Sequence, residues 1–189
     1  MGCYQTKSYT GAKDTNGKVN LNSIPEPTAP PESDPRLPLN SREIFKLQKS
    51  WKAISRNMQI TGIEMFIRIF EKDSNLKSLF HGFRDIDNSY LRDNEALEGH
   101  AGLVMTVVDD AIQNINNVDY VLDLLSRTGG SHTRFEGFDV NFFYKLEEPF
   151  IGAVKMTLEE RFNPNIESIY VKIIKFIIDK LVKSFQNKS

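Results

Sequence analysis

Several features that would point to common classes of protein are scarce or missing in this chain of 189 residues. It has a single cysteine, Cys3, so an intrachain disulfide is excluded and a reducing compartment is expected. No apolar run reaches the roughly 18 residues that a membrane-spanning helix needs. The formal net charge is −1 and no long basic block is present, which argues against a nucleic-acid partner. We find no alternating pattern long enough to predict a β-strand, and no internal repeat.

Proline is abundant only near the N-terminus. Six of the eight prolines lie within residues 25–38, among serine and acidic residues. Such a segment cannot form regular helix hydrogen bonds and favours an extended, solvated backbone. We therefore expect a disordered tail over residues 1–40 and one domain over residues 41–189. A domain of that size buries about 68–70% of the surface of its unfolded chain.

Within the domain, apolar residues recur at helical spacing from end to end, which predicts an all-α fold. Asn40 and Glu43 have the spacing of a capping box at the start of the first helix. Ser74 is placed to cap a short third helix. Asn163 followed by Pro164 predicts the start of the last helix.

Two positions interrupt the helical pattern. Gly129 and Gly130 are adjacent, and each costs a helix roughly 1 kcal/mol relative to alanine. They predict a loose or broken helix immediately before His132. Pro149 lies inside an otherwise helical stretch and predicts a kink near residues 147–148.

Two of the three histidines, His100 and His132, lie on separate predicted helices. Haem iron takes an imidazole nitrogen on one axial face, and a second imidazole can bind the other face or hold a bound gas. A single histidine on an apolar face is more often a packed residue than a ligand. Val104, however, follows His100 by one turn and would touch whatever His100 touches. If His132 closes a helix, the carbonyl of Thr128 is expected to hold its other ring nitrogen.

These residues resemble the globins, and most closely the neuroglobin and globin X branch. The similar segments cover the chain after the proline-rich tail: Ser50-Trp51, Leu76-Lys-Ser-Leu-Phe80, the run from His100 to Ala111, then His132 and Phe142. The resemblance implies a globin fold of about eight helices around a haem pocket.

The resemblance also implies the cofactor and the residues that hold it. The cofactor would be haem b, iron protoporphyrin IX, with His132 as its proximal ligand and His100 as its distal ligand. Leu103 stands where some relatives carry a basic residue towards a haem propionate, which leaves His81 and Arg134 as candidate partners for that group. The expected apolar lining of the pocket is Phe80, Val104, Phe135 and Phe142.

The function implied by the resemblance is reversible binding of O₂, NO or CO, with a role in redox sensing or signalling. If His100 binds the iron, the site is six-coordinate and a gas must displace the imidazole; otherwise its N–H can hydrogen-bond bound O₂. The sequence leaves both open, and the resemblance to neuroglobin favours the first.

Two other functions remain as alternatives. One is a haem enzyme of nitrite, NO or peroxide chemistry or of one-electron transfer, which would need an external reductase because we recognise no reductase domain in the chain. The other is a globin-fold interaction domain without a cofactor. The presence of His132 together with Phe80 argues against this last alternative.

The N-terminus carries a separate signal. Gly2 and Thr6 fit the pattern for N-myristoylation after removal of Met1. One myristoyl chain binds membranes only marginally, and a palmitoyl group on Cys3 would supply the second anchor. We expect a cytoplasmic protein tethered to the cytoplasmic face of a membrane. The alternative is a disordered tail with a free thiol.

Overall fold

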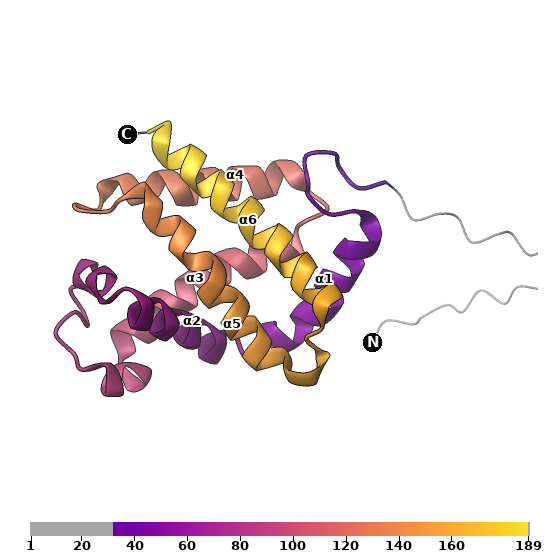
Figure 1. The fold of residues 1–189 in the computed structure, drawn as a ribbon. Coiled ribbons are helices and arrows are strands. Elements are labelled where there is room, and N and C mark those ends of the chain that lie inside the picture. Colours follow the sequence, from indigo (N-terminus) through magenta and orange to yellow (C-terminus); the bar gives the residue numbers. More distant parts are fainter. Residues whose placement is uncertain (1–31, 189) are drawn as a thin grey trace, which may run out of the picture. The chain divides into compact units, whose positions relative to one another are not determined.

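The computed structural model describes residues 32–188, and within them it contains α-helices and short 3₁₀ segments but no strand (Figure 1). The all-α prediction is confirmed. Gly2 and Cys3 lie outside the described residues. The α-helices are α1 (Ser41–Ser55), α2 (Met58–Lys72), α3 (Glu95–Gln113), α4 (Val118–Ser131), α5 (Glu147–Leu158) and α6 (Pro164–Gln186). The 3₁₀ segments are η2 (Ser74–Leu79), η3 (Asn88–Asp93), η4 (His132–Arg134), η5 (Val140–Leu146) and η6 (Glu159–Arg161).

Short polar side chains set the starts of these helices. Asn40 and Glu43 each accept a hydrogen bond from the other's backbone N–H at 3.0 Å, so the predicted capping box is present. Asn163 caps α6, which begins at Pro164 as expected. The cap of η2 is Asp73, not Ser74, because the Asp73 carboxylate accepts the Asn75 N–H at 3.1 Å.

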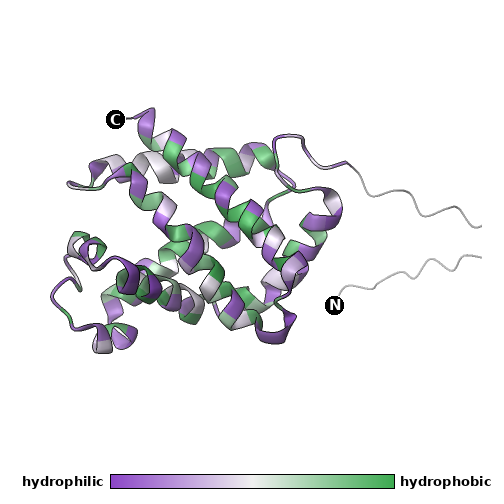
Figure 2. Cartoon of the chain, viewed as in Figure 1, coloured by the Kyte–Doolittle hydropathy of each residue, from purple (hydrophilic) through white to green (hydrophobic). Residues whose placement is uncertain are grey.

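The helices bury one continuous apolar core. α2 packs against α3 and α5, and α4 packs against α6. Hydrophobic and hydrophilic residues are interspersed along the helices (Figure 2). Trp51 is fully buried, its ring 6.5 Å from Phe150 and 6.2 Å from Tyr170, and its indole N–H donates to Asp109 at 2.6 Å. Among residues 32–188, no helix is both long and apolar enough to span a membrane.

The described end of the segment assigned to the tail packs on this domain. Within residues 32–40, Leu37 and Leu39 are buried. Arg36 forms an ion pair of 2.6 Å with Asp119 at the start of α4. The packed part of the chain therefore begins before α1.

α4 runs unbroken to Ser131, so the predicted break at Gly129 and Gly130 is wrong. Both glycines are buried. A Cβ on Gly129 would lie 2.8 Å from the Cα of Leu181 in α6, and one on Gly130 would lie 2.7 Å from the Cε of Lys188. The missing side chains let α6 approach α4 closely, and that packing offsets the helix-propensity cost of glycine.

The discontinuity expected from Pro149 is found near residues 147–148. The chain changes there from the 3₁₀ segment η5 to α5, which begins at Glu147. Pro149 thus lies in the first turn of α5, where the absence of its N–H leaves no helix hydrogen bond unmade.

Candidate cofactor site

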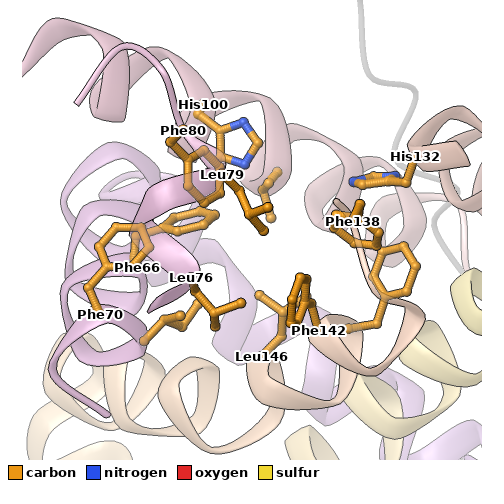
Figure 3. Close-up of a pocket in the computed structure, with 13 residues that line it drawn as sticks. Phe66, Phe70, Leu76, Leu79, Phe80, His100, His132, Phe138, Phe142 and Leu146 are labelled. Atoms are coloured by element: carbon orange, nitrogen blue, oxygen red, sulfur yellow. The ribbon is translucent and has the colours of Figure 1, made fainter. Parts of the chain in front are cut away.

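The two histidines predicted to be ligands face one apolar cavity system. His100 projects from α3 and His132 from the end of α4, and Figure 3 shows both imidazoles at the edge of the same open space. Three adjoining cavities of about 80, 310 and 140 Å³ are lined by both residues. α3 and α4 thus present two imidazoles to one pocket whose other walls are mainly phenylalanine, leucine and valine.

His132 is fixed by the helix that it closes. Its Nδ1 lies 2.8 Å from the carbonyl oxygen of Thr128, one turn earlier in α4, as the sequence predicts. A carbonyl oxygen can only accept, so Nδ1 carries the hydrogen and Nε2 keeps its lone pair. A ring held in this way is oriented and ready to bind a metal through Nε2.

Phenylalanine rings surround His132. The ring centroids of Phe138 and Phe143 both lie 4.9 Å from that of His132, and the centroid of Phe135 lies 5.9 Å away. Phe135 is 52% exposed and marks the mouth of the pocket. Phe138 and Phe143 were not predicted from the sequence, in which the only signal is the density of aromatic residues after His132.

His100 packs edge-on against two other phenylalanines. Its ring centroid lies 5.0 Å from that of Phe66 in α2 and 4.9 Å from that of Phe80. Within residues 32–188 the His100 ring has no hydrogen-bond partner, so both of its nitrogens are available. Phe80 was expected here from the resemblance. Phe66 was not, because its spacing in the sequence is that of any buried helix residue.

Burial keeps both imidazoles neutral at pH 7. It lowers the pKa of His100 to about 4, and the nearby His132 lowers it further by charge repulsion. Burial also lowers the pKa of His132, against the opposing effect of the hydrogen bond to Thr128. Neutral imidazole is the form that binds metals, so the electrostatics of the pocket suit two nitrogen ligands.

The remaining predicted residues are distributed between wall and mouth. Val104 and Phe142 line the cavity with the histidines. Leu103 is 70% exposed at the rim, and Arg134 lines the largest of the three cavities, with its guanidinium 5.0 Å from the Phe135 ring. Of the two candidate partners for a cofactor carboxylate, the structure brings only Arg134 to the cavity. His81 instead bonds to the side chain of Arg84.

The donor set fits a metal that carries its own equatorial ligands. No group of three or more histidine, cysteine, aspartate or glutamate side chains that could hold a bare metal ion occurs in the described part of the chain. Two imidazoles on an apolar slot supply only axial ligands, which is what haem requires of a protein. The aromatic walls match a flat, largely apolar ring, and Arg134 at the mouth matches its carboxylates.

Comparison with known proteins agrees with this geometry. The family model described as Globin matches residues 63–181. The chain is 24% identical to neuroglobin of Dissostichus mawsoni over 142 residues, which are 74% of this chain and 88% of the relative. It is 26% identical to cytoglobin-1 of Oryzias latipes over 138 residues, 72% of this chain and 78% of the relative.

Among solved structures, the chain is similar to a hexacoordinated haem protein from an anhydrobiotic tardigrade. The two share 36% sequence identity with a TM-score of 0.79, over 82% of this chain and 99% of the other. The matched regions contain both histidine-bearing helices, since the family model alone spans α3 and α4. This chain belongs to the globin family.

Proposed function

We propose that this chain binds haem b between His132 and His100 and uses it to bind O₂, NO or CO reversibly. The observation that carries the proposal is the placement of two neutral imidazoles on one apolar pocket, one of them oriented by Thr128. When bound, haem would supply an iron centre that binds an imidazole nitrogen and exchanges small diatomic ligands.

Different residues of the chain have different roles in this function. His132 holds the cofactor, and Phe138 and Phe143 keep water from that ligand. With haem bound, His100 would compete with a gas for the iron. The apparent affinity for gas would then be the intrinsic affinity multiplied by the fraction of molecules in which His100 is off the iron. Once displaced, the N–H of His100 can donate a hydrogen bond to the gas. Two like ligands also suit both oxidation states of iron, which supports a role in redox sensing or signalling.

Arg134 is proposed as the partner of a haem propionate. Within residues 32–188 its guanidinium has no ion-pair partner and rests on the Phe135 ring at the cavity mouth. Arginine binds carboxylates with two parallel N–H donors. Leu103, which lines the same cavity, offers no charge.

The state of His100 can be read from an absorption spectrum of the reduced, gas-free protein. We expect split low-spin bands in the natural sequence and a broad high-spin band in His100→Leu, because leucine cannot bind the iron. If the open state is populated at about 0.1–10%, removing the competitor raises the CO association rate by about 10- to 1,000-fold. Stopped-flow or flash photolysis measures that rate.

His81→Leu is the matched control, since His81 is exposed and bonds to Arg84 away from the cavity. We expect it to leave both the spectrum and the CO association rate unchanged. A high-spin spectrum of the natural sequence, or the same CO rate with and without His100, would show that His100 does not compete for the iron.

The proposed membrane tether rests on the sequence, because Gly2 and Cys3 lie outside the described residues. Gly2→Ala blocks N-myristoylation, so we expect the protein to move from the membrane to the soluble fraction of cells. Cys3→Ser should give an intermediate distribution, since one acyl chain binds only marginally. Gly11→Ala is the matched control and should stay with the membranes. An unchanged distribution of Gly2→Ala would exclude myristoylation of Gly2 as the anchor.

A further inference from the structure

Most of the helical glycines have a packing reason. A Cβ would meet Ala101 and Met105 at Gly62, Leu181 at Gly129, Lys188 at Gly130 and Arg68 at Gly152. Gly99 and Gly102 in α3 are the exceptions, because nothing lies within 4 Å of the place where their Cβ would be. Space does not require glycine at either position.

These two glycines flank His100. Each weakens the helix relative to alanine, about fivefold in the equilibrium between helical and non-helical backbone. Thr106 adds to the effect, because its hydroxyl donates to the carbonyl oxygen of Gly102 at 2.8 Å, a bond that slightly destabilises and bends helices. The turn of α3 that carries His100 is therefore weakened both by glycine and by this side-chain bond.

The buried side of the same turn is held firmly. Gly62 of α2 lets α3 approach closely. A Cβ added at Gly62 would lie 3.1 Å from the carbonyl oxygen of Ala101 and 3.3 Å from the Ala101 Cβ. Ala101 and Met105 are fully buried at this crossing. α3 thus has a fixed contact on one side of His100 and unconstrained glycines on the other.

His100 cannot leave its position by turning towards α2. Its ring already touches the rings of Phe66 and Phe80 (Figure 3). Those rings are in turn packed on Phe70 and Phe83, with Phe80 stacked on Phe83 at 4.9 Å. Because the four phenylalanines interlock, the direction towards α2 is closed to the imidazole. It can be displaced only by rotation away from α2 or by movement of the α3 backbone.

We propose that Gly99 and Gly102 are positioning residues that set how readily His100 leaves the iron. They do so by letting the turn around it deform while Ala101 stays packed on α2. The inference rests on the proposed six-coordinate function and deepens it. It predicts that the gas affinity of this site is controlled by α3 backbone and not only by the groups that touch the cofactor.

The test is Gly99→Ala, Gly102→Ala and the double variant in the full, haem-loaded chain. Alanine favours the helical, closed turn, so we expect the equilibrium for His100 departure to fall about fivefold for each substitution. CO binding kinetics give that equilibrium. Amide hydrogen exchange in α3 gives a second readout: exchange should rise when CO binds to the natural sequence and rise less in the double variant. Ser168→Ala, an exposed α6 position, should change neither.

A mutant cycle with His100→Leu separates positioning from a general effect on the pocket. Without His100 there is no imidazole to displace. In the His100→Leu background, the double glycine substitution should therefore change the CO association rate by less than about twofold, whereas a change of 1 kcal/mol would alter it about fivefold. An equal slowing with and without His100 would overturn the inference. A low-spin spectrum of the glycine variants, together with an unchanged equilibrium for His100 departure, would overturn only this inference. A high-spin spectrum of the natural sequence would overturn the six-coordinate function itself.

Discussion

Replacement of His132 by alanine is expected to release the cofactor and to remove the Soret band of the natural protein. His132 is the ligand whose ring is held in place, by the 2.8 Å bond from its Nδ1 to Thr128. Loss of a residue that merely supports a metal ligand costs about 10- to 100-fold in metal affinity. Loss of the ligand itself should exceed about 100-fold. The rate of haem transfer to an excess of a haem-free acceptor measures the change.

Two controls keep this result specific. His81→Ala removes an exposed histidine outside the cavity and should retain haem as the natural sequence does. Added imidazole should restore the low-spin spectrum of His132→Ala, because it can enter the space left by the side chain and bind in its place. If His132→Ala keeps full haem loading, an unaltered Soret peak and the natural rate of haem transfer, haem is not bound through His132.

The parts of the fold that were predictable from the sequence are those decided by a few neighbouring residues. The capping box of Asn40 and Glu43 and the start of α6 at Asn163 involve contacts within three residues. The bond from His132 to Thr128 is of the same kind, since it spans one helical turn. Local spacing is therefore enough to find helix ends and the orientation of a histidine that closes a helix.

Contacts between distant segments were not predictable in this way. Phe66 meets His100 only because α2 crosses α3, and nothing in the sequence of α2 distinguishes Phe66 from the other apolar residues of that helix. Leu37 and Leu39 are buried although they lie in the segment that was expected to be a disordered tail. Their burial was not predictable because their partners lie elsewhere in the chain. The break predicted at Gly129 was wrong for the same reason: propensity describes an isolated helix, whereas α6 lies directly against this one.

Gly129→Ala is expected to destabilise the fold, although the same change stabilises an isolated helix. A Cβ at this position would lie 2.8 Å from the Cα and 3.0 Å from the carbonyl carbon of Leu181, and backbone cannot yield as a flexible side chain does. Overpacking costs about 1–3 kcal/mol, and alanine regains about 1 kcal/mol of helix propensity. The middle of that range leaves a net loss of about 1 kcal/mol, which lowers Tm by about 2–4 °C in a protein of this size.

Gly99→Ala is the matched control, because its Cβ has no neighbour within 4 Å. The gain in helix propensity is then unopposed, and we expect the free energy of unfolding to rise by up to about 1 kcal/mol. Thermal or urea unfolding of the two variants should move in opposite directions. A rise in Tm for Gly129→Ala would mean that α6 withdraws from α4 at no cost. Since His132 closes α4, the close packing of α4 on α6 would then not fix its position in the pocket.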